Sequence, residues 1–215
     1  MKFIDFFAGV GGFRRGMELA GHECVGFCEF DKFATASYTS MHLLTQEQRE
    51  FLDKMPLKQR QKEILKEEYR NGEWYANDIR RVYAGDIPKA DCWCFGFPCQ
   101  DISVAGKQLG FQGNRSSLFF RVMYLIGQLE EENRPTYLFI ENVKNLLSVN
   151  GGWDFARLLI EMERGGMMQN GKCSTPKISE CHRTEKGVSL SDILEAEAPQ
   201  KYFLSKEQTE KIVFK

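Results

Sequence analysis

The feature of this sequence that most constrains its fold is the alternation of short apolar runs with segments of helical periodicity over residues 1–165. Short apolar runs bounded by glycine or acidic residues are typical of buried strands. Strands that alternate with helices predict an α/β fold, in which a mostly parallel sheet carries helices on both faces. We expect strands over 2–7, 23–29, 91–95 and 136–140, and helices over 13–20, 31–44, 116–132 and 152–164.

Chemically unusual residues follow the predicted strands directly. They are Gly9–Gly12, Glu29, Pro98-Cys99 and Glu141. In parallel sheets of this kind, ligands bind at the carboxyl ends of the strands. We therefore expect these residues to form one site at that edge of the sheet.

The composition excludes several classes of protein. Hydrophobic residues make up 42% of the chain, which is too many for a disordered protein. The net charge of −1 argues against a basic field over the whole chain, so nucleic-acid binding would need a local patch. No apolar run approaches the ~20 residues of a membrane span, and the start lacks the layout of a signal peptide. We expect a cytoplasmic protein, or a nuclear one in a eukaryote, with no membrane partner.

Two segments depart from the alternating pattern. The charged stretch 46–70 predicts a solvated helical hairpin inserted at the edge of the sheet, with Thr45 as its cap and a break at Pro56. From Gly165 onward the periodicity is lost. We expect a catalytic domain over 1–166, which contains the insert at about 45–72, and a linker and remnant over 167–215. Short helices are expected at Ser189–Glu197 and Ser205–Phe214, the second with a capping box from Ser205 to Gln208.

The glycine-rich turn Gly9-Val10-Gly11-Gly12 lies between a predicted strand and a predicted helix. Glycines allow positive φ and let a ligand approach the backbone. The dinucleotide fingerprint fails because Arg14 occupies the place of its last glycine. Glu29, at the end of the next strand, is placed to accept hydrogen bonds from two ribose hydroxyls. The alternative is a glycine turn without a ligand.

The seven cysteines are an odd number without a secretory context, so a disulfide framework is not expected. Cys92, Cys94 and Cys99 do not have a usual zinc spacing, and we expect no metal site. Cys99 follows a strand and a proline, where a thiol could act as a thiolate nucleophile or be merely structural. Glu141 is either a pocket carboxylate with a raised pKa or a structural acid whose charge is satisfied.

Taken together, these residues resemble the DNA (cytosine-5) methyltransferases. Residues 5–16 (DFFAGVGGFRRG) look like the family's first motif, and Glu29-Phe30 look like the second. Asn77-Asp78-Ile79 is similar to the third motif and residues 96–103 (GFPCQDIS) to the fourth. The fifth and sixth motifs are resembled by 115–119 (RSSLF) and by Glu141-Asn142-Val143.

The resemblance implies a Rossmann-like S-adenosylmethionine-dependent methyltransferase fold, with S-adenosyl-L-methionine as cofactor and double-stranded DNA as substrate. It also implies an enzyme of the restriction-modification type. It implies that Cys99 adds to C6 of a flipped cytosine while protonated Glu141 donates to N3. Residues 103–114 would form a lid. The implied catalytic residues are Pro98, Cys99, Glu141 and Asn142. The implied cofactor residues are Phe6, Ala8, Gly9, Gly11, Gly12, Glu29, Phe30, Asp78, Ile79, Phe97 and Leu118.

The sequence also departs from this family. The eighth motif, Gln-x-Arg-x-Arg, is not found, and neither are the recognition domain and the last two motifs. Residues 187–195 and 201–212 resemble the segment that leads into that domain. We expect a C-terminal part to be missing or truncated: the chain is a degraded gene product, one subunit of a split enzyme whose second chain supplies recognition, or an artefact of how the sequence was obtained. In each case it would bind DNA weakly alone.

Three other functions stay open. A tRNA cytosine-5 methyltransferase shares the Pro-Cys and Glu-Asn-Val motifs. A non-catalytic module would bind the cofactor or a partner without methylating. A zinc-binding module is the third alternative, which metal analysis would test.

Overall fold

The computed structural model describes residues 1–97, 118–143, 152–167, 171–174, 187–188 and 209–214. The chain forms two compact units, Met1–Phe95 and Gly96–Lys215. Each unit is described by itself below. The predicted division into domains at residue 166 stays a prediction.

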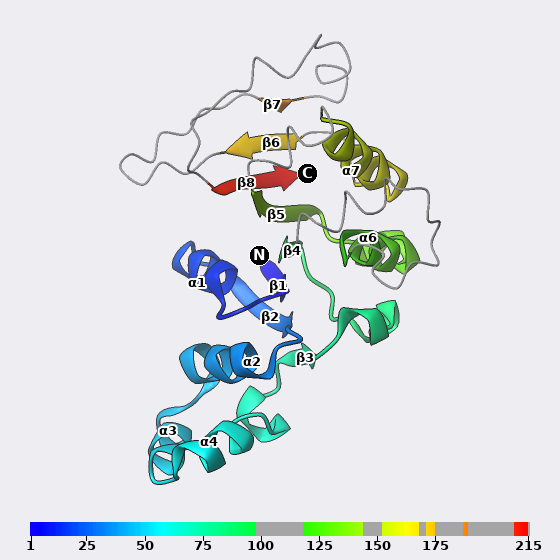
Figure 1. Cartoon of the computed structure of the whole chain (residues 1–215). Helices are drawn as coiled ribbons and strands as arrows, with labels where there is room; N and C mark the ends of the chain where they lie inside the picture. Colours follow the sequence, from blue (N-terminus) through cyan, green and yellow to red (C-terminus); the bar gives the residue numbers. More distant parts are fainter. Residues whose placement is uncertain (98–117, 144–151, 168–170, 175–186, 189–208, 215) are drawn as a thin grey trace. The chain divides into compact units, whose positions relative to one another are not determined.

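The first unit is built on four parallel strands in the order β3-β2-β1-β4 (Figure 1). Fully buried side chains of Phe3, Ile4, Phe6, Phe27 and Phe95 give this sheet its core. The apolar runs therefore predicted three of the strands correctly, and β3 is an additional strand. The bounds are β1 Lys2–Phe6, β2 Glu23–Cys28, β3 Trp74–Ala76 and β4 Cys92–Gly96, whose last residue belongs to the second unit.

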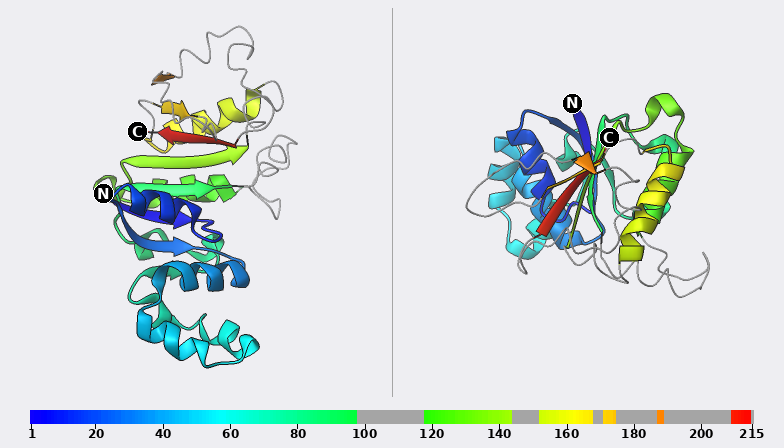
Figure 2. Two further views of the ribbon diagram at one scale, coloured as in Figure 1. Left: turned by 90° about the vertical axis from the view of Figure 1, so that its left-hand side faces the viewer. Right: turned by 90° about the horizontal axis from the view of Figure 1, so that it is seen from above.

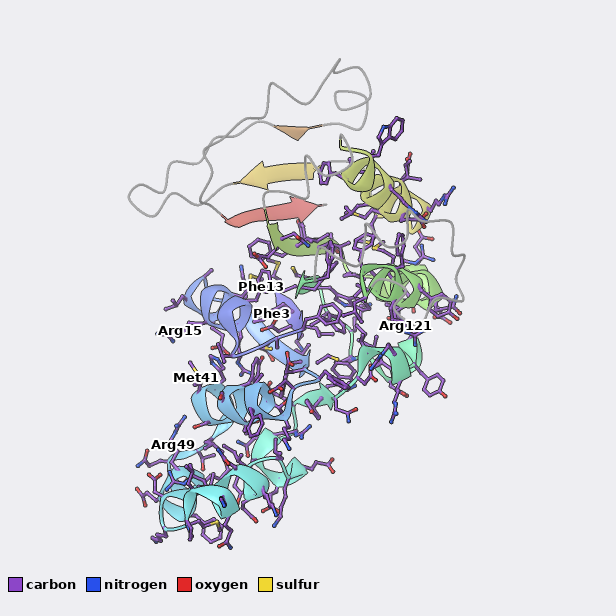
Figure 3. The ribbon with its side chains drawn as sticks, in the orientation of Figure 1. Phe3, Phe13, Arg15, Met41, Arg49 and Arg121 are labelled. Atoms are coloured by element: carbon purple, nitrogen blue, oxygen red, sulfur yellow. The ribbon has the colours of Figure 1, made fainter. Side chains whose placement is uncertain are left out.

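Helices α1 (Gly12–Leu19) and α2 (Lys32–Tyr38) lie on the same side of this sheet (Figures 1 and 2). Asp31 caps α2, because its carboxylate accepts hydrogen bonds from the N–H groups of Phe33 and Ala34 at 2.8 and 2.9 Å. A π-helical turn, η1 (Thr39–Leu43), continues α2. The predicted helices over 13–20 and 31–44 are thus confirmed. Figure 3 draws Arg15 on the outer side of α1.

The charged insert forms the predicted hairpin of α3 (Gln46–Asp53) and α4 (Leu57–Glu63), followed by the 3₁₀ turn η2 (Glu67–Arg70). Thr45 and Gln48 form a capping box, and Pro56 separates the two helices at the N-cap of α4. The hairpin extends past α2, away from β1 (Figure 2). Its own small core of Leu52, Ile64 and Tyr69 packs against Ala36 and Leu44, next to α2 and η1.

The second unit combines two helices with antiparallel strands. Helices α6 and α7 lie on the same side of β5 (Figure 1), and the strand order is β5-β8-β6-β7. The apolar face of α6 buries Phe119, Val122, Leu125 and Ile126. The bounds are α6 Leu118–Gln128, the 3₁₀ turn η5 Glu131–Asn133, β5 Tyr137–Val143, α7 Trp153–Arg164, β6 Gly171–Ser174, β7 Gly187–Val188 and β8 Thr209–Phe214.

Two expectations about the second unit were wrong. The predicted helix Ser205–Phe214 is replaced over Thr209–Phe214 by strand β8, which pairs antiparallel with β5. Its β-branched and aromatic residues favour a strand once a partner edge is available. The strand predicted over 136–140 continues to Val143, so that Glu141 and Asn142 lie within β5 rather than after it.

Some expectations fall on residues that the structure does not describe. The predicted helix Ser189–Glu197, the capping box from Ser205 to Gln208 and the predicted lid over 103–114 lie outside the described residues. In the part of the chain that is described, no helix is both long and apolar enough to cross a membrane.

Candidate functional site

The glycine-rich turn follows β1 and leads into α1. Gly9 and Gly11 have positive φ values of 55° and 89°, and the Gly11 N–H closes the turn onto the Ala8 carbonyl at 2.8 Å. A Cβ at Gly9 or Gly12 would meet nothing within 4 Å, whereas one at Gly11 would collide with the imidazole of His42. Gly11 is therefore required by packing, and the backbone at Gly9 and Gly12 borders open space that a ligand can approach.

The Glu29 carboxylate ties this turn to the loop after β2. Oε2 accepts a hydrogen bond from the Gly9 N–H at 2.8 Å, and Oε1 accepts one from the Asp31 N–H at 2.7 Å. Each carboxylate oxygen can accept two hydrogen bonds, so within the described residues both keep one acceptor direction. This arrangement suits a ligand with two neighbouring hydroxyl groups, such as a ribose.

Phe30 and Asp78 follow β2 and β3 and come together through Arg80. The Phe30 ring is 72% exposed, and the Arg80 guanidinium carbon lies 5.5 Å from its centroid. The same guanidinium forms a two-point ion pair with Asp78, with both N–O distances at 2.8 Å. This hydrogen-bonded pairing lowers the pKa of the Asp78 carboxyl. An exposed aromatic face beside an ionised carboxylate fits a flat base that carries an amino group.

The other predicted cofactor residues of the first unit lie in or near its core. Phe6 is fully buried and packs on Trp93, with the ring centroids 4.8 Å apart. Ala8 and Ile79 are also buried. These three residues can meet a ligand only through their backbone or a small exposed edge.

A buried carboxyl group lies directly beneath the turn. Asp5 is fully buried on β1, and its Oδ2 accepts a hydrogen bond from the Arg14 N–H in the first turn of α1 at 3.3 Å. Within the described residues its Oδ1 accepts no hydrogen bond. Burial raises the pKa of the Asp5 carboxyl well above its ordinary value.

In the second unit, the end of β4 meets β5. A Cβ on Gly96 would lie 2.7 Å from Oε2 of Glu141, so glycine is needed for this carboxylate to approach the chain. The buried Asn142 donates a hydrogen bond from Nδ2 to the Phe97 carbonyl at 2.8 Å. Phe97 also packs on Phe119 of α6, with the ring centroids 5.2 Å apart.

Gly96, Phe97, Glu141 and Asn142 are therefore neighbours, as expected from their places at the ends of two predicted strands. Leu118, the remaining predicted cofactor residue, is half-buried at the start of α6. Pro98 and Cys99 lie outside the described residues, directly after Phe97.

Sequence reasoning missed two charged residues close to these positions, Arg80 and Asp5. Arg80 is two residues after the N-cap Asp78 of the 3₁₀ turn η3 (Ile79–Arg81), a spacing that allows a local ion pair. Asp5 is an acid inside an apolar run, which was the available signal for a buried carboxyl.

A family model described as C-5 cytosine-specific DNA methylase matches residues 1–66 and 54–169. The type II methyltransferase M.HhaI of Haemophilus parahaemolyticus is 36% identical over 152 residues, which are 71% of this chain and 36% of the relative. The type II methyltransferase M.DsaV of Dactylococcopsis salina is 32% identical over 164 residues, or 76% of this chain and 37% of the relative. The chain thus spans about a third of the length of these curated relatives.

Solved structures show the same fold at low sequence identity. The Dnmt2 methyltransferase of S. pombe has a TM-score of 0.53 and 14% identity, over 100% of this chain and 48% of that one. The Entamoeba histolytica methyltransferase EhMeth has a TM-score of 0.54 and 15% identity, over 100% of this chain and 52% of that one. The expected methyltransferase fold is confirmed, and the chain belongs to the C-5 cytosine-specific DNA methylase family.

Proposed function

We propose that this chain is the catalytic part of a DNA (cytosine-5) methyltransferase of the restriction-modification type, which uses S-adenosyl-L-methionine. The observation that carries the proposal is the approach of the Glu141 carboxylate to Gly96, three residues before Cys99. The reaction requires a thiol at C6 and a carboxyl group at N3, two atoms that lie opposite each other in the cytosine ring.

The first unit supports cofactor binding. Within the described residues, Glu29 keeps acceptor directions for two ribose hydroxyls, and Gly9 and Gly12 border open space. Phe30 and Asp78 suit an adenine. S-adenosyl-L-methionine, when bound, supplies an electrophilic methyl group. The other predicted cofactor residues, including Phe97 and Leu118, are proposed to bind the same cofactor.

The chain's own residues perform the remaining chemistry. The Cys99 thiolate forms a bond to C6 of cytosine, and Glu141 in its protonated form donates its proton to N3, which makes C5 nucleophilic. After methyl transfer, a base removes the C5 proton, and the bond to Cys99 breaks as the C5–C6 double bond forms again. N3 returns its proton to Glu141 in the same stage. Asn142 holds the Phe97 carbonyl, which positions the segment that carries Pro98 and Cys99. The target base has to leave the duplex to reach the thiol.

Covalent trapping on 5-fluorocytosine tests the proposal, because fluorine at C5 blocks the elimination of Cys99. The full chain is incubated with S-adenosyl-L-methionine and either duplex DNA or tRNA that contains this base. We expect an adduct with DNA, its loss in Cys99→Ser, and a strong reduction in Glu141→Gln but not in the control Glu132→Gln. If an adduct forms with tRNA and not with DNA, the substrate is tRNA and the proposal of a DNA substrate is wrong. If no adduct forms with either nucleic acid but a second polypeptide with a recognition domain restores it, the chain is one subunit of a split enzyme.

A further inference from the structure

Arg80 makes every hydrogen bond that Asp78 accepts within the described residues. Its Nε donates to Oδ1 and its Nη2 donates to Oδ2, both at 2.8 Å, and its backbone N–H donates to Oδ1 at 3.0 Å. A bidentate pair of this kind fixes the plane of the carboxylate as well as its position.

The same guanidinium also lies over the Phe30 ring. Its central carbon is 5.5 Å from the ring centroid, which is within cation–π distance. Phe30 follows β2 and Asp78 follows β3, so one side chain spans two loops at the carboxyl edge of the sheet. Phe30 is 72% exposed, so Arg80 is well placed to fix the orientation of its ring.

Arg80 does not use every acceptor direction of the Asp78 carboxylate. A carboxylate has about four lone-pair directions. Arg80 occupies both directions on Oδ1 and one on Oδ2. Arg81 Nε is 3.9 Å from Oδ2, which is beyond hydrogen-bond distance. Among the described residues, no donor takes the second acceptor direction on Oδ2, which suits an amino group.

We propose that Arg80 is a positioning residue for the adenine of the cofactor: its guanidinium holds the Asp78 carboxylate and the Phe30 ring in the orientation that accepts the adenine amino group and stacks on the base. This inference rests on the proposed function, because it assigns a further residue to the same cofactor site. Arg80 itself does not need to touch the cofactor.

The charged surroundings of Asp78 support a pH-dependent test. Arg80 lowers the pKa of the Asp78 carboxyl, with a smaller contribution from Arg81. Burial, together with the charges of Glu29 and Asp78, raises the pKa of the nearby Cys28 thiol to about 12, so that thiol stays neutral. Removal of Arg80 should move the pKa of Asp78 up toward its ordinary value. A cofactor contact that needs the ionised carboxylate would then fail at a higher pH.

The test is calorimetric titration of the full chain with S-adenosyl-L-homocysteine, a stable ligand that carries the same adenosine. We expect Arg80→Ala to weaken binding about tenfold, the usual effect of losing the support of a charged hydrogen bond. Arg80→Lys should recover only part of this loss. Its ammonium group restores the positive charge, but it cannot form the two-point pair. The matched control is Arg81→Ala, whose side chain is 83% exposed, and it should bind as the wild type does.

Two further readouts separate positioning from structural damage. As the pH is lowered from about 8 to 4, the affinity of Arg80→Ala should begin to fall at a higher pH than that of the wild type. The wild type should also prefer S-adenosyl-L-homocysteine to its inosine analogue, which lacks the amino group, and this preference should shrink in Arg80→Ala.

The possible outcomes are distinct. Unchanged affinity, pH profile and base preference in Arg80→Ala would overturn the inference and leave the proposed function intact. Tighter binding by Arg80→Ala would overturn it too, because Arg80 would then obstruct the site. Absence of binding by the wild type would overturn the proposed cofactor site and this inference with it.

Discussion

Arg14 of α1 and Glu73, which precedes β3, form a two-point ion pair in which Nη1–Oε2 and Nη2–Oε1 are both 2.7 Å. Arg14 is only 5% exposed, and its Nε also pairs with Glu18 at 2.8 Å. Arg14 occupies the position where a dinucleotide fingerprint would have its last glycine. The departure from that fingerprint therefore has a structural role, because Arg14 joins the first helix to the lead-in of β3.

We expect Glu73→Gln to lower the free energy of unfolding by about 3 kcal/mol, because it leaves a buried guanidinium without its main compensating charge. Urea denaturation at neutral pH measures the change. Glu18→Gln is the matched control, since Glu18 is more exposed and its loss should cost less than about 1 kcal/mol. Equal losses in the two variants would mean that burial does not make the Arg14–Glu73 ion pair more stabilising than the more exposed Arg14–Glu18 pair.

Gly11→Ala should destabilise the first unit by about 3 kcal/mol. The change combines a positive φ with a Cβ that collides with His42, and each effect contributes on the order of 1–2 kcal/mol. Gly12→Ala, whose Cβ would enter open space, should have little effect. Thermal denaturation of both variants, of His42→Ala and of Gly11→Ala/His42→Ala provides the measurement. The double variant should recover only the part of the stability loss that comes from the collision with His42. If the stability changes of Gly11→Ala and His42→Ala simply add in the double variant, the predicted collision does not occur.

The sequence predicted the parts of the fold that depend on local pattern. Strands β1, β2 and β4 are apolar runs with clear ends, and Thr45 with Gln48 forms the expected capping box. Strand β3 was missed because it has only three half-buried residues and gains its stability from pairing with β2. Strand β8 was mistaken for a helix because its pairing with β5 is a tertiary contact that the local sequence does not encode.

The candidate site was predictable to a similar extent. Glu29 and Glu141 stood out as acids at strand ends, whereas Asp78 was recognised only through the family resemblance. Arg80 had no signal of its own, because exposed arginines are common and its importance depends on where Phe30 and Asp78 lie in space. The predicted site residues as a set stay predictions until binding and activity are measured.

Asp5→Asn should make the stability of the first unit less dependent on pH. The pKa of the buried Asp5 carboxyl is raised in the folded state, mainly by burial, so the folded state holds this proton where the unfolded state releases it. The wild type should therefore lose stability as the pH rises from about 4 through the folded pKa. Asparagine stays neutral, and its amide oxygen can still accept from the Arg14 N–H.

Urea denaturation of the wild type and Asp5→Asn at several pH values checks this sign. The advantage of Asp5→Asn should grow with pH and shrink toward pH 4, in contrast to the control Asp86→Asn at an exposed position. A wild-type chain that becomes more stable than Asp5→Asn as the pH rises would show that Asp5 is ionised and stabilised in the fold.

Asn142→Ala should separate methyl transfer from cofactor binding. The buried Asn142 amide donates to the Phe97 carbonyl at 2.8 Å, and its removal frees the backbone that leads to Cys99. We expect trapping on 5-fluorocytosine DNA to slow by about tenfold or more, the range for loss of one buried hydrogen bond at a reacting geometry. Affinity for S-adenosyl-L-homocysteine should fall less than the trapping rate. Among the proposed cofactor residues, Asn142 contacts Phe97, whereas Glu29 and Asp78 lie in the first unit. Asn142→Asp keeps the shape but loses the donor, so it should be as slow as Asn142→Ala, while Asn133→Ala in η5 should trap at the wild-type rate. Normal trapping by Asn142→Asp would mean that the side chain acts by filling space and not by its hydrogen bond.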